Sequence, residues 1–365
     1  MSSRLHNAVR DALSLVRKSN LVEATALIRA ALASAKTAPP HEVSNSNLLS
    51  AALPQSTAEE TYTWKRKETR KSVSEKAPET YGGTGQFTSR NYHHVERDLT
   101  YMLYVPSNNS GNERSLLLML HGCTQNPKDF ALGTQMNRLA DEFNIIVAYP
   151  LQPQSANSSG CWNWFDERHQ KHGSGEPAML ASLAENLSGE FNISDKRVFA
   201  AGLSAGGAMA EILASTYPQQ FAAVGVHSGL PHGAATSLVN AFSAMKGSSK
   251  FERRSRKKGT RQSRRIVFHG SSDATVHPSN GERIVNQSRQ DSIKLKEIEI
   301  TNVINGRNVS RTILEDQNGM PIVEQWVVTG GGHAWFGGNS RGSYSDPKGP
   351  DASREMVRFF LMGKY

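Results

Sequence analysis

Cysteine is scarce in this sequence, which has only Cys123 and Cys161 among its 365 residues. Two cysteines are too few for a disulfide scaffold, and their spacing is not that of a metal-ligand motif. Long apolar runs are also missing, because no stretch approaches the roughly 18 apolar residues that a membrane-spanning helix needs. We therefore expect neither a metal site nor a membrane span.

An export signal is missing from the N-terminal region as well. No continuous apolar segment is present there, because basic residues interrupt it at Arg4, Arg10, Arg17 and Lys18. The sequence therefore predicts a cytoplasmic protein, and it leaves non-standard secretion open.

Excess positive charge is confined to one segment. The chain has a formal charge of +9, and residues 246–265 alone contain ten basic residues and one acidic residue, a net +9, so the remainder sums to zero. A run of like charges without an apolar period is typical of a solvated loop, and we interpret it as a mobile basic insertion. The alternative is a contact with a polyanion or an anionic surface. Because the positive charge is confined to these 20 residues and the remainder is neutral, we do not expect nucleic acid to be the partner of the protein.

The hydrophobic fraction of 37% is low for a chain of this size, which indicates that part of it stays unpacked. Residues 1–36 are predicted to form a helical hairpin, because apolar side chains recur at helical spacing on both sides of a break at residues 19–20. Such short helices cannot bury their apolar faces alone, so they should dock on the main domain or mediate oligomerisation. Residues 37–89, rich in Pro, Ser, Thr, Glu and Lys, are predicted to be a mostly disordered linker.

Strand-like and helix-like segments alternate over residues 90–365, the predicted catalytic domain. The predicted strands are an opening hairpin at 92–105 and single strands at 115–120, 145–149, 222–227, 265–269 and 323–329, and the predicted helices are 179–191 and 205–215. Asn305-Gly306 and Asn318-Gly319 are hairpin-turn signals. The alternation predicts an α/β fold, with a mostly parallel central sheet flanked by helices. Functional groups should then lie at the carboxyl ends of the strands.

Residues 197–214 carry the strongest functional signal, because a short apolar strand runs into Gly202-Leu-Ser204-Ala-Gly206 and then into a helix. A sharp turn between strand and helix exposes a serine hydroxyl as a nucleophile, and the two glycines let strand and helix pass closely. The five-residue pattern alone is weak evidence in a chain this rich in glycine and serine. It needs a base, an acid and oxyanion donors to support it.

A base and an acid are found after two other predicted strands. His333 follows the strand at 323–329 through a glycine loop, and Asp273 follows the strand at 265–269, which produces the chain order Ser204, Asp273, His333 that is expected of an α/β-hydrolase. Asp291 and Asp316 are weaker candidates for the acid. The alternative interpretation of Asp273 is a turn residue whose side chain caps its own loop.

Two backbone N–H groups must converge on the oxyanion. One is expected from Ala205, directly after the serine, and the other from Cys123, in the loop after the strand at 115–120. His121 would then fix this loop. The alternative for Cys123 is a small buried apolar residue, which is compatible with a backbone role.

Together these residues resemble the polyhydroxybutyrate depolymerase family of esterases, which includes feruloyl- and acetyl-esterase-like members. The matching motifs are Leu120-His-Gly-Cys-Thr-Gln125, Cys161-Trp-Asn-Trp-Phe165, Gly202-Leu-Ser-Ala-Gly-Gly207, His269-Gly-Ser-Ser-Asp-Ala-Thr-Val-His277 and Gly332-His-Ala-Trp335. The resemblance implies an α/β-hydrolase fold and carboxylic-ester hydrolysis without a cofactor. It also implies that Cys123 and Cys161 pair as a disulfide.

The resemblance leads to a functional hypothesis, a serine esterase acting on short-chain hydroxyalkanoate esters, as oligomers or polymer. Trp162, Trp164 and Trp335 flank the motifs and are candidates for an apolar substrate pocket, although core packing explains each of them equally well. The alternatives are a feruloyl- or acetyl-type carbohydrate esterase and, in another class, a non-catalytic protein that binds a polymer granule or another partner. The sequence shows no polymer-binding domain, and acyl and alcohol specificity depend on loops.

Overall fold

The computed structural model describes residues 81–107, 113–248, 262–291 and 295–362. The chain separates into two units, Met1–Val73 and Ser74–Tyr365, and all the described residues belong to the second. The predicted helical hairpin at 1–36 and most of the predicted linker at 37–89 therefore lie outside the described residues.

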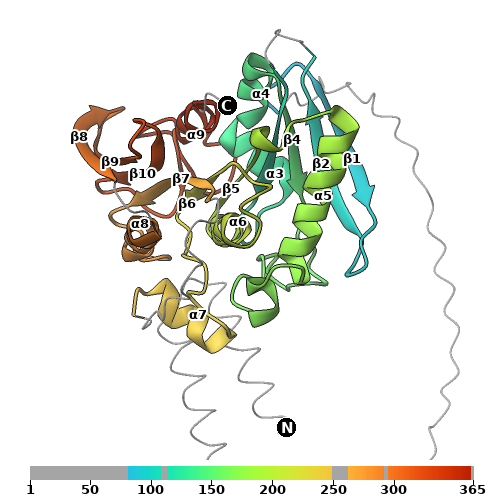
Figure 1. The fold of residues 1–365 in the computed structure, drawn as a ribbon, viewed down its shortest axis with the longest axis horizontal. Coiled ribbons are helices and arrows are strands. Elements are labelled where there is room, and N and C mark those ends of the chain that lie inside the picture. The colour runs from blue at the N-terminus through green and yellow to red at the C-terminus, as the bar shows by residue number, and fades with distance from the viewer. Residues whose placement is uncertain (1–80, 108–112, 249–261, 292–294, 363–365) are drawn as a thin grey trace, which may run out of the picture. The chain divides into compact units, whose positions relative to one another are not determined.

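A ten-stranded sheet forms the centre of the second unit, in the order β1-β2-β4-β3-β5-β6-β7-β10-β9-β8 (Figure 1). The strands are β1 (Gln86–Tyr92), β2 (Leu99–Val105), β3 (Ser115–Leu120), β4 (Ile145–Pro150), β5 (Val198–Leu203), β6 (Ala223–His227), β7 (Arg264–Gly270), β8 (Lys296–Ile304), β9 (Arg307–Glu315) and β10 (Pro321–Val328). From β4 to β10 every neighbouring pair is parallel, and the pairs at both ends of the sheet are antiparallel. Two short strands, β11 (Trp335–Phe336) and β12 (Ser345–Asp346), pair separately.

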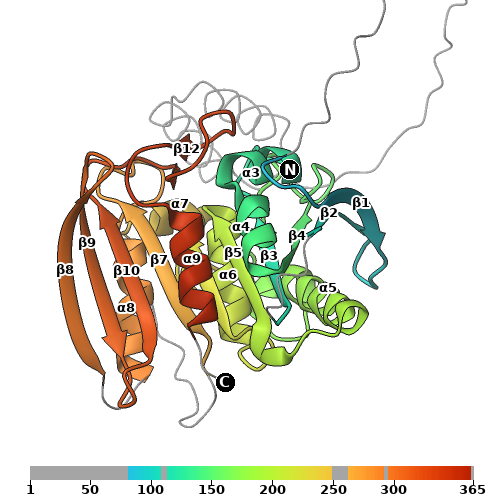
Figure 2. The same ribbon diagram turned by 90° about the horizontal axis from the view of Figure 1, so that it is seen from above.

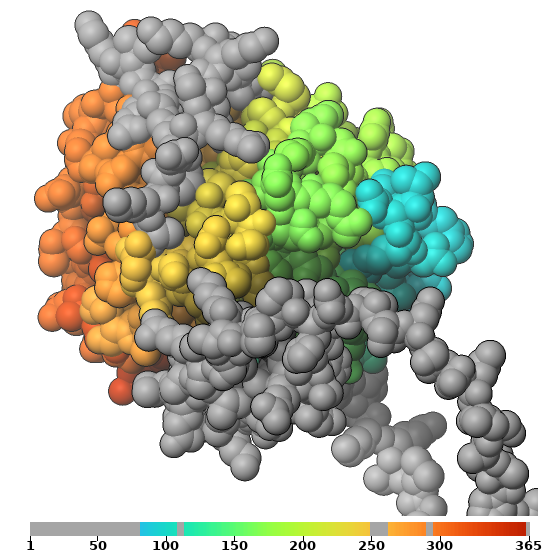
Figure 3. Space-filling model, turned by 90° about the horizontal axis from the view of Figure 1, so that it is seen from below, coloured from blue at the N-terminus to red at the C-terminus, as the bar shows by residue number. Residues whose placement is uncertain are grey.

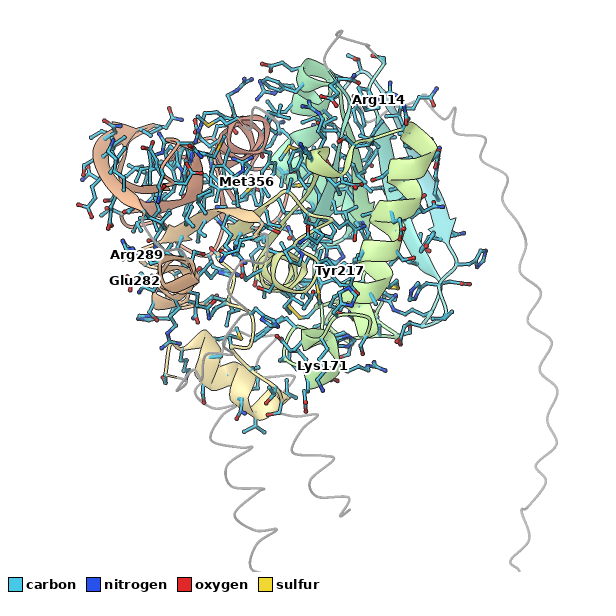
Figure 4. All side chains as sticks on the ribbon, viewed as in Figure 1. Arg114, Lys171, Tyr217, Glu282, Arg289 and Met356 are labelled. Carbon is cyan, nitrogen blue, oxygen red and sulfur yellow. A yellow bond between two sulfur atoms is a disulfide. The ribbon has the colours of Figure 1, made fainter. Side chains whose placement is uncertain are left out.

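Helices cover both faces of this sheet. One face packs against α3 (Pro127–Thr134), α4 (Met136–Phe143) and α9 (Ala352–Leu361), and Met356 of α9 lies between that helix and the sheet (Figures 2 and 4). The other face packs against α5 (Gly175–Phe191), α6 (Ala205–Thr216), α7 (Leu238–Met245) and α8 (Ser279–Asp291). Figure 3 shows this side, with the yellow residues that include α7 between the green and orange parts of the chain. Two single-turn helices, Glu167–Gln170 and Asp195–Arg197, complete the described elements.

The continuous apolar runs in the sequence are the central strands. Every residue of β3, β4 and β5 is buried, as expected where helices cover both faces of a parallel sheet. The two predicted hairpin turns also occur, with Asn305-Gly306 between β8 and β9 and Asn318-Gly319 between β9 and β10. The predicted α/β architecture is confirmed.

The predicted boundary at residue 90 between linker and domain is wrong. Strand β1 begins at Gln86 and pairs with β2 from Gln86↔Val105 to Tyr92↔Leu99. The chain is ordered against the domain even earlier, because the Gly85 N–H donates to the Tyr104 hydroxyl at 2.6 Å. The hairpin predicted at 92–105 is present, but its first strand lies at 86–92, before the predicted start. That strand was not located because it lies at the edge of the sheet and has no fully buried side chain, so its sequence is mostly polar.

The predicted basic insertion at 246–265 needs correction at its C-terminal end, and its centre, residues 249–261, lies outside the described residues. Arg264 and Arg265 belong to the buried strand β7. The Arg264 guanidinium donates to the carbonyl oxygens of Phe359 and Phe360 at 2.9 and 3.0 Å. Arg265 forms a buried ion pair with Glu211 of α6, with Nε 2.8 Å from Oε2. Two of the ten basic residues are therefore structural, because a buried charge must be paired.

Candidate active site

Ser204 occupies a strained turn between β5 and α6. Its backbone has φ 57° and ψ −117°, values that non-glycine residues seldom adopt, and its N–H donates to the carbonyl oxygen of His227 at 2.9 Å. The glycines on either side are required, because a Cβ at Gly202 would collide with the backbone of Gly206, and one at Gly206 with the carbonyl of Leu120. The turn therefore holds the serine at the carboxyl end of β5, at the start of a helix.

His333 and Asp273 are brought together by two neighbouring strands. Asp273 follows β7 and His333 follows β10, and these strands are parallel, so their carboxyl ends share one edge of the sheet. The Nδ1 atom of His333 lies 2.8 Å from Oδ2 of Asp273. The other carboxylate oxygen, Oδ1, accepts the N–H groups of Thr275 and Val276 at 2.9 and 2.8 Å.

The Asp273 carboxylate is held in its ionised form. Burial by itself would raise the pKa of Asp273, but hydrogen bonds from His269 and His333, together with the Val276 N–H, hold that pKa well below its usual range. An ionised acceptor at Oδ2 keeps the proton of His333 on Nδ1, which leaves Nε2 unprotonated. His333 can then act as a base through Nε2.

Of the other acids that the sequence suggested, Asp316 has a different role. Its Oδ1 accepts the N–H groups of Asn318 and Met320, both at 2.9 Å, so it stabilises the turn between β9 and β10. Asp291 ends α8, and its side chain is not among the described ones. Asp273 is the carboxylate that contacts His333.

His227 connects the serine to the loop that carries His333. Its carbonyl oxygen accepts from Ser204, its Nε2 accepts the N–H of Phe336 at 3.1 Å, and its ring stacks on Trp335 with centroids 5.0 Å apart. Ser204 and His333, both described in the structure, are not hydrogen-bonded to each other. Such bonds are often long without substrate and shorten in the complex.

The loop after β3, which contains Cys123, lies against Ser204, and Ala205 follows Ser204 at the start of α6. A Cβ placed on Gly122 would be 3.6 Å from Cβ of Ser204. Within the described residues, the N–H groups of Cys123 and Ala205 donate to no other protein group. Both are therefore free to donate to a substrate oxygen, and that of Ala205 has the positive end of the α6 dipole behind it.

His121 and Gln125 fix this loop from two sides. The buried His121 donates from Nδ1 to the Gly122 carbonyl at 2.8 Å and accepts the Gln152 N–H on Nε2 at 3.1 Å. The side chain of Gln125 accepts the Gly122 N–H at 2.9 Å and donates to Asp129 at 3.1 Å. These bonds set the direction of the peptide groups next to Cys123.

A disulfide joins Cys123 to Cys161 and ties the oxyanion loop to the loop after β4. Behind it, the buried Glu176 of α5 accepts hydrogen bonds from Gln152 and Asn163. Disulfides persist in oxidising compartments, whereas the sequence predicts a cytoplasmic protein. The location of the protein therefore stays a prediction.

The predicted pocket role of the tryptophans is corrected by their positions. Trp162, Trp164 and Trp335 are 0%, 4% and 1% exposed and belong to the two apolar core clusters. Trp335 packs edge-on against Phe130 and donates its indole N–H to Ser353 at 3.0 Å. Full burial of a large aromatic ring stabilises the fold more than partial exposure in a pocket wall does. This difference explains why the three tryptophans are core residues.

Burial of neutral histidines predicts that the domain loses stability in mild acid. Burial lowers the pKa of His121, and burial together with the nearby His269 and His333 lowers the pKa of His227 well below its ordinary value. Below about pH 6.5 the unfolded chain therefore binds protons that the folded chain does not, at about 1.4 kcal/mol per pH unit for each residue. The stability that the two neutral histidines contribute is fully present above about pH 6.5. It is lost as the pH falls toward their lowered pKa values.

Urea unfolding between about pH 7 and pH 5 measures this effect. The free energy of unfolding should fall with pH, and His227→Gln, which keeps an acceptor for the Phe336 N–H, should flatten the slope. A free energy that is constant over this interval would contradict the assignment of both histidines as neutral.

Two structural features, a cluster of metal-binding side chains and a membrane-spanning helix, were considered over residues 81–107, 113–248, 262–291 and 295–362. No group of three or more His, Cys, Asp or Glu side chains in these ranges is arranged to hold a metal ion. Likewise, no helix found there has the length and apolar character needed to cross a bilayer.

The parallel sheet, the strained serine after β5 and the acid–histidine pair after β7 and β10 define an α/β-hydrolase. The chain belongs to the esterase PHB depolymerase family, whose sequence model matches residues 99–296. His333 lies beyond the matched residues, so its place in the site rests on the geometry.

Individual relatives agree with this family. Poly(3-hydroxyalkanoate) depolymerase C of Paucimonas lemoignei is 31% identical over 246 residues, which cover 65% of this chain and 58% of that protein. Acetylxylan esterase A of Talaromyces purpureogenus is 29% identical over 194 residues, 49% of this chain and 50% of that protein. The chain thus spans about half the length of these relatives. The solved acetyl xylan esterase from Aspergillus awamori shares the fold, with a TM-score of 0.56 and 21% identity over 76% of this chain and 99% of that one.

Proposed function

We propose that this chain is a serine esterase that hydrolyses carboxylic esters of short-chain hydroxyalkanoates, as oligomers or polymer, through an acyl-enzyme. The observation that carries the proposal is the 2.8 Å bond between Asp273 and His333, at the sheet edge where Ser204 sits in a strained turn. Membership of the esterase family supports an ester as substrate. The relative named as a poly(3-hydroxyalkanoate) depolymerase supports a hydroxyalkanoate as the acyl part of that ester.

In this mechanism the Ser204 hydroxyl attacks the ester carbonyl while Nε2 of His333 accepts its proton. Asp273 stabilises the resulting imidazolium, and the N–H groups of Cys123 and Ala205 stabilise the oxyanion. His333 then returns the proton to the departing alcohol, which leaves an acyl group on Ser204. A water molecule, deprotonated by His333, releases the acid and restores the serine. No cofactor is needed in any of these steps.

A second candidate function is the hydrolysis of acetyl or feruloyl esters of carbohydrates. Relatives named as an acetylxylan esterase and as feruloyl esterase B of Neurospora crassa favour it. The catalytic groups would be the same, because the fold positions the chemistry and the loops select the substrate. Oligomerisation through residues 1–36 stays a prediction, since they lie outside the described residues.

A panel of substrates distinguishes these functions. Soluble 3-hydroxybutyrate oligomers should be hydrolysed with a kcat/KM at least about tenfold higher than that for acetylated xylan oligosaccharides or methyl ferulate. A preference for either carbohydrate-type substrate would favour the second function. Absence of hydrolysis of every ester, including p-nitrophenyl butyrate, by folded protein would favour a non-catalytic binding role.

A further inference from the structure

Tyr344 is a partly exposed aromatic residue that the proposed mechanism does not use. It lies between β11 and β12 and is 47% exposed. Its backbone has φ 51°, a left-handed value that is unusual for tyrosine. Its carbonyl oxygen accepts the Trp335 N–H at 2.7 Å, two residues after His333. The chain thus holds Tyr344 beside the base in a conformation that has an energetic cost.

The side chain of Tyr344 spans the base and the oxyanion loop. Its ring packs edge-on against His333, with centroids 6.4 Å apart and an interplanar angle of 81°. Its hydroxyl lies 3.2 Å from Oγ1 of Thr124, the residue that follows Cys123. Because the Thr124 hydroxyl donates to the Cys123 carbonyl at 2.6 Å, the Tyr344 hydroxyl is the donor to Thr124. The ring of Tyr344 therefore lies next to both His333, the proposed base, and the loop of Cys123, a proposed oxyanion donor.

The segment before Tyr344 is anchored by the same residues that fix the oxyanion loop. The N–H of Ser343 donates to Asp129 at 2.9 Å, and its carbonyl oxygen accepts from the Gln125 side chain at 3.0 Å. Gln125 also accepts the Gly122 N–H. The position of the ring is thus fixed relative to the loop that carries Cys123.

We infer that Tyr344 determines specificity for the alcohol part of the ester, which packs against the exposed part of its ring. This inference rests on the proposed function, because the leaving alcohol must approach Nε2 of His333 to receive the proton. A side chain that lies edge-on to this imidazole and remains partly exposed is placed to contact the alcohol. Apolar and aromatic alcohols gain from that contact, whereas methanol is too small to cover the ring.

Methyl butyrate and benzyl butyrate test the inference, because they form the same acyl-enzyme and release alcohols of nearly equal acidity. In Tyr344→Ala, kcat/KM for benzyl butyrate should fall about tenfold, and that for methyl butyrate less than about threefold. Tyr344→Phe keeps the ring and should keep the preference for the benzyl ester. Val303→Ala, which shortens an exposed side chain on the edge strand β8, is the control and should leave both values unchanged.

The possible results separate this inference from the proposed function. If both esters lose the same factor in Tyr344→Ala, or neither changes, the specificity role is wrong. A shift in the acidic limb of the pH profile of kcat/KM for that variant would also overturn it, since the ring would then act by positioning His333. If the wild-type protein hydrolyses neither ester, the proposed function itself fails.

Discussion

Replacing Ser204 with alanine is expected to lower kcat for p-nitrophenyl butyrate by about 10⁴- to 10⁶-fold while the domain stays folded. The acyl-enzyme route needs the serine oxygen, and no other hydroxyl occupies the strained turn after β5. Alanine keeps the Cβ atom and the backbone bond to the His227 carbonyl, so the turn itself should persist. Release of nitrophenol, followed by absorbance, measures the loss.

Ser215 at the far end of α6 offers a matched control, because its hydroxyl donates to Glu211 within the helix. Ser215→Ala should hydrolyse the ester at close to the wild-type rate. Persistent hydrolysis by Ser204→Ala, with unfolding behaviour like that of the wild type, would show that another group is the nucleophile.

Asp273→Asn is expected to reduce kcat by about 10⁴-fold through the wrong tautomer of His333. The N–H groups of Thr275 and Val276 require an oxygen at the Oδ1 position, so the amide nitrogen of asparagine would face His333. That nitrogen is a donor, and Nδ1 would have to accept from it. The proton would then reside on Nε2, which could no longer accept a proton from Ser204.

The pH dependence and a second variant check this explanation. The loss should be smaller at high pH, where hydroxide can assist the reaction, and Asp316→Asn should keep wild-type activity because Asp316 stabilises a turn elsewhere. Near-normal turnover by Asp273→Asn at neutral pH would show that His333 is oriented by another group.

The central architecture was predictable from the sequence for a physical reason. Strands covered on both faces are continuously apolar, so β3, β4 and β5 could be found from hydrophobic runs, and glycine-containing turns marked the β8–β9 and β9–β10 hairpins. The carboxyl ends of parallel strands meet at one edge, which led to Asp273 and His333 although 60 positions separate them. The structure places these two side chains in contact.

Features that depend on edges and tertiary packing could not be predicted. Strand β1 and the strand β8 are mostly exposed edge strands, so they lack the apolar signal that reveals a buried strand. A run of basic residues conceals that Arg264 and Arg265 turn inward, because their partners, the carbonyl oxygens at the end of α9 and Glu211, are distant in sequence. The aromatic residues near the motifs could equally have been core or pocket, and only packing decided for the core.

Tyr344 and Gln125 illustrate the same limit at the site. Gln125 was part of a recognised motif, but its bond to the Ser343 carbonyl joins segments that are 218 residues apart. Tyr344 lies in a polar loop without periodicity, so nothing in the sequence marked it. Its contacts with Thr124 and His333 arise only in the folded chain, where the segment between β11 and β12 lies against the oxyanion loop.

The central claim is that Ser204 is an activated nucleophile, and labelling by a fluorophosphonate probe tests it most directly. The probe reacts with a serine only when a base and an oxyanion site activate it. Mass spectrometry of the labelled wild-type protein should place the phosphonate on Ser204, and Ser204→Ala should remain unlabelled. Folded wild-type protein that resists the probe, or that bears the label on another serine, would contradict the claim.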